Sequence, residues 1–263
     1  MSSFASKRPS NAPERPRVDG NWSVVIPSRN EGPQLLATVA QVIEEAGARD
    51  LDVVVVDDGS TDGSARVVQR SAAPLRYQRQ ARAGIGAARN RGVELARGRY
   101  IAFLDADDVW PDASLGLRLD AMRASPGTAC VFGAVEEFVS PELGGEARAA
   151  IATAPAQPAR LAGSMLIERE AFARVGLFDP GLVVGETLDW VARAEDAGIV
   201  MQTVDAVVLR RRIHRDNTVT REKARQSDYL RVLRGALTRR RAGRAVGADA
   251  SRMPRTSGPL DRE

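Results

Sequence analysis

This 263-residue chain has few of the residues that build disulfide, thiolate or imidazole chemistry. Cys130 is the only cysteine, which excludes an internal disulfide and favours a reducing, cytoplasmic compartment. His214 is the only histidine, so a His-rich metal site is excluded and a Ser-His triad would depend on that one residue. No apolar run approaches the roughly 20 residues of a membrane span, and residues 1–20 lack the apolar core of a secretory signal. The reactive groups are therefore expected to be carboxylates.

Charge is divided unevenly along the chain. The formal net charge is +4, but residues 210–244 hold 13 Arg and Lys against 3 Asp and Glu, whereas residues 1–209 carry a net charge of −6. Hydrophobic residues make up 43% and charged residues 27%, which is typical of a globular domain and not of a disordered chain. We therefore expect an acidic folded body followed by a basic C-terminal segment.

The hydrophobic pattern predicts alternating strands and helices after residue 21. Residues 1–21 are rich in Pro, Ser and Arg and are expected to be a disordered leader. Strands are expected at 22–27, 53–56, 75–79, 100–104 and 129–139, and helices at 33–47, at 84–97, after Pro111 and in a short stretch ending near 72. This alternation predicts an α/β fold with an open, mostly parallel sheet and helices on both faces.

The second half of the chain has a less regular pattern. Residues 140–160 are rich in Gly, Pro and Ala and are expected to form a surface loop. The remaining expectations are helices near 168–175 and 187–197, a strand at 199–209, a basic helix at 221–241 and a disordered tail at 242–263.

Polar clusters follow three of the predicted strands. They are Ser28-Arg29-Asn30-Glu31, Asp57-Asp58 and Asp105-Ala106-Asp107-Asp108. Each cluster alone is more typical of a turn or a helix cap, but ligands of open α/β sheets bind beyond the carboxyl ends of the strands. Close carboxylates repel each other unless a cation lies between them, and oxygen ligands select Mg²⁺ or Mn²⁺. The Asp105-x-Asp107 pair is therefore a candidate site for a metal with open positions for diphosphate oxygens.

Seven segments occur in a characteristic order. They are Val24–Glu31, Val55–Ser64, Ala88–Gly92, Phe103–Asp108, Ser164–Ile167, Val175–Asp179 and Arg212–Asn217. Together they resemble the GT-A glycosyltransferases of family 2, over roughly residues 22–220. The resemblance implies a GT-A (Rossmann-like) fold with a nucleotide-binding half at about 22–110 and an acceptor half at about 111–220. It also implies metal-dependent, inverting sugar transfer from a nucleotide-diphosphate donor, expected to be a UDP-sugar, to an unidentified acceptor, with Mn²⁺ or Mg²⁺ as cofactor.

The resemblance implies roles for individual residues. The nucleotide base and ribose would be lined by Pro27, Ser28, Arg29, Glu31 and Asp57. Arg89 and Ala106 would lie near the donor, and Asp105 would hold the ribose or the metal. Asp107 would be the main metal ligand, and His214 stands at the position of the family's Arg-x-His pattern, where it can approach the metal or the diphosphate. The alternative for His214 is a surface residue in a basic run.

The general base is the point at which the chain departs from the family pattern. The family normally has a Glu-Asp pair at the start of one helix, and this chain reads Glu186-Thr187 there. A threonine hydroxyl cannot accept the acceptor's proton, so Glu186 or Asp189 is the expected catalytic base, with Glu186 preferred. The alternative for Glu186 is stabilisation of a helix N-terminus. The departure also keeps a second function open, that of a non-catalytic nucleotide-sugar-binding or scaffolding protein.

The basic C-terminal segment has three interpretations. Arg210, Arg211 and Arg212 could face a diphosphate. Residues 221–241 could lie on an anionic membrane or contact nucleic acid. They could also form a solvated helix that packs on the domain through apolar side chains at helical spacing. Because the net positive charge averages an acidic body and a basic end, we expect no nucleic-acid partner, and peripheral membrane contact stays open.

Overall fold

The computed structural model describes residues 21–46, 51–71, 73–144, 148, 151, 153–214 and 226–250. The disordered leader that we predicted at 1–21 lies outside this description except for Asn21. The predicted tail lies outside it beyond residue 250, and so does the last part of the Arg212–Asn217 segment.

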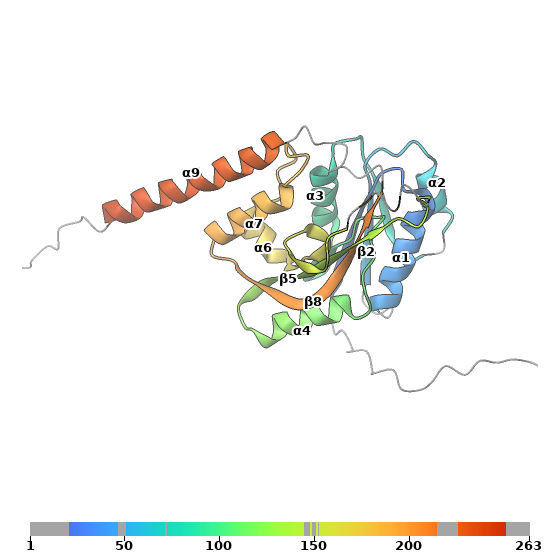
Figure 1. Cartoon of the computed structure of the whole chain (residues 1–263), viewed down its shortest axis with the longest axis horizontal. Helices are drawn as coiled ribbons and strands as arrows, with labels where there is room; N and C mark the ends of the chain where they lie inside the picture. Colours follow the sequence, from blue (N-terminus) through green and yellow to red (C-terminus); the bar gives the residue numbers. More distant parts are fainter. Residues whose placement is uncertain are drawn as a thin grey trace, which may run out of the picture.

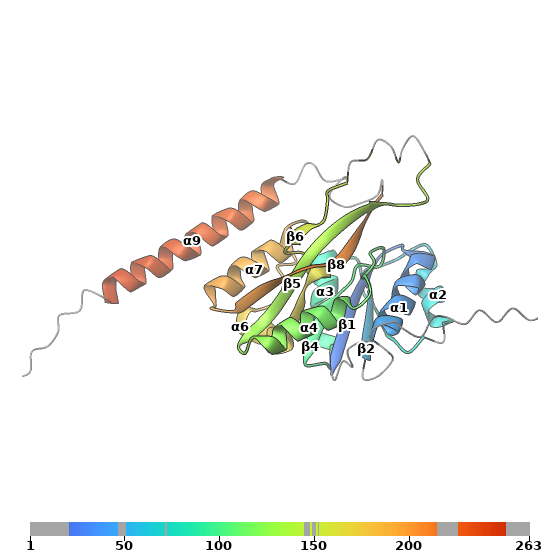
Figure 2. The same cartoon turned by 60° about the horizontal axis from the view of Figure 1, so that its bottom comes forward.

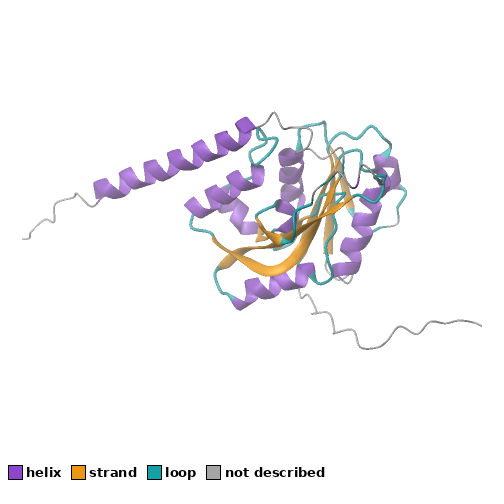
Figure 3. Ribbon diagram, viewed as in Figure 1, coloured by secondary structure: helices purple, strands orange, loops and turns teal. Residues whose placement is uncertain are grey.

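A mostly parallel sheet of eight strands organises the domain (Figure 3). The strands are β1 (Trp22–Ser28), β2 (Leu51–Asp57), β3 (Arg76–Arg79), β4 (Tyr100–Phe103), β5 (Thr128–Val139), β6 (Gln157–Ala159), β7 (Leu166–Glu168) and β8 (Val200–Ile213). Their order is β3-β2-β1-β4-β7-β5-β6, and β8 pairs with β5. The β1–β2, β1–β4, β2–β3 and β5–β8 pairs are parallel, whereas β7 is antiparallel to both of its neighbours.

Two short strands correct the predicted organisation. The stretch 140–160, expected to be only a surface loop, contains β6, which pairs with β5. The strand β7 was not predicted either. The β-α alternation continues along the chain through α4 to β5, as predicted, but β7 lies between β4 and β5 in the sheet. Each strand has three residues, too few for a period-two pattern to be recognised in the sequence.

Helices cover both faces of the sheet, as expected (Figure 1). One layer contains α1 (Gly32–Ala46), α2 (Ser64–Gln69) and α4 (Ser114–Ala124), and the other contains α3 (Ile85–Leu95), α6 (Arg169–Val175) and α7 (Glu186–Asp196). The valines of β2 show why: Val53 and Val55 belong to the core on the α1 side, whereas Val54 and Val56 pack with Ala88 of α3. An all-valine strand is suited to burial on both faces.

The helix α9 (Gln226–Ala250) runs further than the helix predicted at 221–241 and replaces the start of the predicted tail, and residues 221–225 lie outside the described residues. Figures 1 and 2 show it extending away from the body, and its contacts with the body are chiefly to α7. Among the helices in the described part of the chain, none combines the length and the apolar character that crossing a bilayer requires.

Candidate active site

The three polar strand ends meet at one edge of the sheet. The registers align Ser28 with Asp57 and Val25 with Phe103, so β1, β2 and β4 end side by side. Side chains then link the loops that follow: the backbone NH of Asn30 donates to Ser60 Oγ at 2.9 Å, and the NH of Thr61 donates to Asn30 Oδ1 at 2.8 Å. The polar clusters that we singled out in the sequence therefore lie together.

Asp57 and Asp58 organise the loops beneath this edge. Asp57 is 1% exposed; it accepts hydrogen bonds from the NH of Ser60 at 2.7 Å and from the Tyr77 hydroxyl. Burial, followed by that carboxylate, raises the pKa of Tyr77. Asp58 accepts bonds from the backbone NH groups of Ala83 and Gly84 at 2.7 and 2.8 Å. The structure thus places Asp57, predicted to contact the nucleotide, below the loop surface, and Tyr77 is a partner that the sequence did not reveal.

The other residues predicted on the nucleotide side differ in exposure. Pro27 and Ser28 are buried in β1, and Ser28 Oγ has no hydrogen-bond partner among the described residues. Arg29 is exposed and Glu31 is half-buried. Ala106 is buried, and its carbonyl accepts a bond from Thr38 Oγ1 of α1 at 2.8 Å. Ser28 Oγ is consequently a polar atom at the strand end that a ligand could satisfy.

Asp107 and His214 form the acidic and imidazole pair of the site. Asp107 Oδ2 lies 2.9 Å from His214 Nε2, which joins the β4 loop to the end of β8. Glu31 is close by: burial, followed by the negative charge of Asp107, raises the pKa of Glu31 to about 7, and Asp105 contributes in the same direction. Several carboxylates thus lie close together, and a bound cation would relieve their mutual repulsion.

The turn that carries Asp107 is anchored to β8. The backbone NH of Arg212 donates to Asp108 Oδ1 at 2.8 Å, and Arg212 Nε donates to the carbonyl of Asp107 at 2.8 Å. Asp108 is buried, and burial followed by the charges of Asp107 and Asp105 raises the pKa of Asp108 well above its usual range. Arg212 therefore holds the turn in place, a role that the sequence pattern did not show.

The two preceding arginines of β8 form ion pairs with β5. Arg210 pairs with Glu136 at 2.9 Å and Arg211 pairs with Glu137 at 3.5 Å. These glutamates lie on β5, which runs parallel beside β8 (Figure 2). The interpretation that Arg210 and Arg211 face a diphosphate is therefore not supported by their positions.

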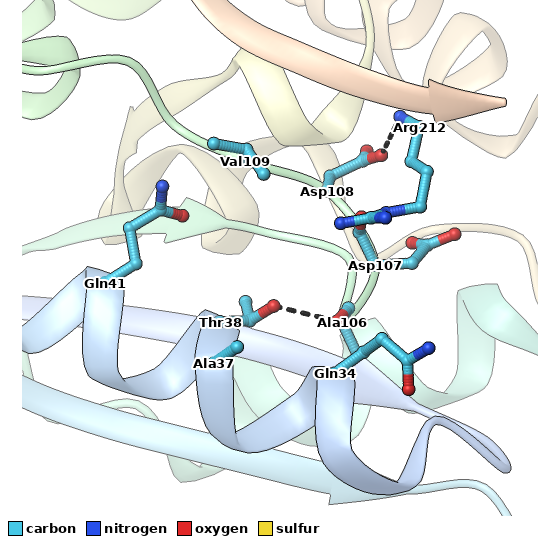
Figure 4. A pocket seen from close by; sticks show the side chains of 9 residues that line it. All are labelled: Gln34, Ala37, Thr38, Gln41, Ala106, Asp107, Asp108, Val109 and Arg212. Atoms are coloured by element: carbon cyan, nitrogen blue, oxygen red, sulfur yellow. Dashed lines mark hydrogen bonds between the residues drawn. The ribbon is translucent and has the colours of Figure 1, made fainter. Parts of the chain in front are cut away.

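A small cavity of about 160 Å³ opens between α1 and the turn after β4 (Figure 4). It is lined by Gln34, Ala37, Thr38, Gln41, Ala106, Asp107, Asp108, Val109 and Arg212. Pockets for complete small-molecule ligands usually measure about 300–1,000 Å³, so this cavity can take only part of a nucleotide sugar. It marks the α1 flank of the candidate site.

Arg89 connects the two halves of the site. Its Nη2 donates to the two oxygens of Asp105 at 2.7 and 3.0 Å, and its Nη1 donates to Glu186 Oε1 at the start of α7. Thr187 Oγ1 lies 3.1 Å from the same Glu186 oxygen. The side chains of Arg89 and Glu186 are 6% and 11% exposed. The structure therefore brings Glu186 beside a donor-side residue, and it buries Arg89 between two carboxylates.

Asp189, the other candidate base, has a different environment. Its Oδ2 accepts a bond from Arg193 Nε at 2.8 Å. Arg193 also donates to the carbonyls of Val175 and Leu177 at 2.8 and 2.7 Å. Asp189 thus belongs to an ion pair that fixes the end of α6 on α7, whereas Glu186 is paired with Arg89 on the side of the candidate site.

The residues present fit a divalent cation that is completed by its substrate. Across the described ranges, no group of three or more His, Cys, Asp or Glu side chains is arranged to hold a metal ion alone. Asp107 and His214 supply one carboxylate and one imidazole within 2.9 Å of each other. Two protein ligands leave most coordination positions open, which suits Mg²⁺ or Mn²⁺ bound together with phosphate oxygens.

The chain is similar in sequence to known proteins. The family model described as "Glycosyl transferase family 2" matches residues 23–163. The chain is 40% identical over 93 residues to the uncharacterized glycosyltransferase YibD of Escherichia coli, a match that covers 34% of this chain and 27% of that protein. The chain therefore spans well under half the length of this curated relative.

Solved structures establish the fold. The mannosyltransferase PcManGT of Pyrobaculum calidifontis, in complex with GDP-Man and Mn²⁺, superposes with a TM-score of 0.65 at 22% identity over 88% of this chain and 68% of that one. TarS 1–349 of S. aureus, in complex with UDP-GlcNAc, also has a TM-score of 0.65, at 16% identity over 83% of this chain and 66% of that one. The fold is that of the GT-A glycosyltransferases, as the sequence resemblance implied.

Proposed function

Because the chain belongs to glycosyl transferase family 2, as the match to residues 23–163 shows, we propose that it moves a sugar from a nucleotide-diphosphate donor to an acceptor hydroxyl, with inversion at the anomeric carbon. We assign donor binding to residues 22–110 and acceptor binding to residues 111–220. The observation that carries the proposal is the Arg89 bridge, which holds Glu186 from the second half against Asp105 from the first.

A divalent cation, Mn²⁺ or Mg²⁺, belongs to this proposal. Asp107 and His214 would hold it, and Glu31 and Asp105 would add negative charge around it. When bound, the cation offsets the charge that develops on a departing nucleoside diphosphate. Similar folds have been solved with GDP-Man and Mn²⁺ and with UDP-GlcNAc, which supports nucleotide-sugar binding, and we take a UDP-sugar as the first donor to test.

Glu186 acts as the general base in the proposed reaction. Its carboxylate accepts the proton of the acceptor hydroxyl while that oxygen attacks the anomeric carbon on the face opposite the diphosphate. The bond between the anomeric carbon and the diphosphate oxygen breaks, and its electron pair leaves with the nucleoside diphosphate. Arg89 and Thr187 hold the Glu186 carboxylate in position. Preorganised geometry of this kind lowers the entropic part of the barrier.

A second candidate function rests on Thr187. The hydroxyl occupies the position of the family's usual aspartate and bonds to Glu186 instead of offering a second carboxylate. If the Glu186 carboxylate, held by Arg89, does not accept the acceptor's proton, the protein binds a nucleotide sugar without transferring it. As for location, the lone buried Cys130 supports action in the cytoplasm, where thiols stay reduced.

The test is a donor panel. The protein is incubated with UDP-, GDP- and dTDP-sugars in Mn²⁺, Mg²⁺ or EDTA, while donor binding and nucleoside diphosphate release are measured. Transfer is supported by cation-dependent release with one donor. Cation-dependent binding without release on any acceptor supports the binding protein. Failure of every donor to bind, with the cation present, contradicts both.

A further inference from the structure

The side of α9 that faces away from the body carries large apolar side chains. Leu230, Leu233 and Leu237 are 50%, 60% and 56% exposed, whereas Val232 on the opposite side is 7% exposed. At 3.6 residues per turn the three leucines fall on one stripe along the helix. A stripe of three exposed leucines is unusual on a surface that contacts only water.

The inner side of α9 contacts the body, so the stripe faces outward. Ion pairs and hydrogen bonds join the inner side to α7 and to the loop before α7: Arg231 to Asp179 at 2.9 Å, the NH of Val183 to Asp228 at 3.1 Å and Arg239 to Asp196 at 2.8 Å. The structure therefore presents the leucine stripe outward as a stable feature.

Positive charge flanks the stripe. Arg234 and Arg241 are exposed and, at helical spacing, lie beside Leu230 and Leu237. Within the described residues neither arginine has an ion pair with the body, in contrast to Arg239 on the inner side. The outer face of α9, defined by Leu230, Leu233, Leu237, Arg234 and Arg241, is thus apolar along its middle and cationic at its edge.

We propose that the outer face of α9 binds an anionic membrane surface. An amphipathic helix of this composition lies in the interface, with leucines among the acyl chains and arginines at the anionic headgroups. Figures 1 and 2 show α9 on the outside of the body, next to α7, so the side of α9 opposite its contacts with α7 faces away from the body. This surface is separate from the candidate active site and does not depend on the proposed transfer.

Two other occupants fit the outer face less well. Nucleic acid would match the arginines but would leave the three leucines unburied, since phosphate contacts are electrostatic. A second copy of the chain, packed face to face, would bury the leucines but would place arginines opposite arginines. The carboxylates of Glu195 and Asp196, which could neutralise them, already pair with Arg240 and Arg239.

The experiment is vesicle cosedimentation of the full chain. We expect binding to vesicles that contain phosphatidylglycerol, weak binding to pure phosphatidylcholine, and a decrease as salt rises. The variant L230Q/L233Q/L237Q should lose at least about tenfold in partitioning, because it removes the apolar part of the interaction. R234Q/R241Q should keep the leucines but lose the preference for anionic vesicles.

The matched control is Leu117→Gln, which removes a leucine that is 40% exposed on α4, outside the proposed surface. It should bind vesicles like the unmodified chain. Circular dichroism should show unchanged helix content in every variant, because all of these side chains are exposed. The proposal is overturned if anionic vesicles are not bound or if the triple leucine variant binds them equally. It is also overturned if the triple variant instead dissociates a dimer or abolishes binding to duplex DNA while vesicles are not bound.

Discussion

The guanidinium of Arg89 on α3 donates a hydrogen bond to the carboxylate of Glu186 at the start of α7, although the two residues are 97 positions apart in the chain. The same guanidinium holds Asp105 at the end of β4. One buried guanidinium therefore links the end of β4 to the start of α7.

Removing this cation should destabilise the protein. Arg89→Met leaves Glu186 and Asp105 without their partner, and breaking a buried pair in this way costs about 3 kcal/mol. Arg91→Met on the same helix is the control, because its pair with Glu94 is exposed and is worth at most about 1 kcal/mol. Urea unfolding at equilibrium measures both. Equal, small effects of the two variants would show that the Arg89 bridge contributes nothing to the fold.

Asp107 should control the response to cations. A ligand present at about 100 times its dissociation constant stabilises a folded protein by about 2.7 kcal/mol, so Mn²⁺ with UDP should raise the melting temperature. The increase should disappear in Asp107→Asn and decrease in His214→Ala. The exposed Asp112 provides the control, since Asp112→Asn should respond like the unmodified chain. An undiminished increase in Asp107→Asn would place the cation elsewhere.

Glu31 should make stability depend on pH. Burial and the charge of Asp107 raise the pKa of Glu31 from 4.5 to about 7 in the folded state, so between these values the folded state holds a proton that the unfolded chain has released. The free energy of unfolding contributed by Glu31 therefore falls as pH rises from about 4.5 to about 7 and is constant above that. Without added metal, Glu31→Gln should flatten this part of the profile, whereas Glu170→Gln at an exposed position should not. A decline that is identical in all three proteins would assign it to other groups.

Because α3 packs closely on β1 at Gly92, a side chain at that position should destabilise the protein. A Cβ there would overlap the side chain of Val25. Gly92→Ala should thus cost about 1–3 kcal/mol, the usual range for overpacking. Gly235→Ala, on the described part of α9, is the control and should be neutral or stabilising by up to about 1 kcal/mol, because alanine is the better helix former. Thermal unfolding measures both, and a neutral Gly92→Ala would mean that α3 can shift away from the sheet.

Local patterns in the sequence predicted most of the fold. The valine run of β2 and the spacing of Leu35 and Val39 on α1 are short-range signals. Each predicted a strand or a helix and the residues that it buries. Polar residues after β1, β2 and β4 were enough to predict that these clusters lie together at one edge of the sheet, because parallel strands end together. The strands β6 and β7 were missed because three residues carry no readable period.

The arrangement of the site was less predictable, because its bonds join distant parts of the chain. Nothing near Arg89 or Glu186 in the sequence indicates that they meet, and nothing near Tyr77 indicates that its hydroxyl reaches Asp57. The partner of Asp189 likewise depends on where Arg193 points, which only the packing of α6 on α7 determines. The sequence thus indicated which types of residue lie at the candidate site, but not which side chains bond to one another.

The most direct test of the account compares nucleoside diphosphate release by the unmodified chain, Glu186→Gln and Asp189→Asn, with the donor and cation that the panel identifies. We predict that Glu186→Gln loses about 10²–10⁴-fold in rate, the usual contribution of a general base, while its Kd for the donor is unchanged. Asp189→Asn should keep most of the rate and lose stability instead. A Glu186→Gln variant that works at the unmodified rate, or a folded but inactive Asp189→Asn variant, would contradict the account.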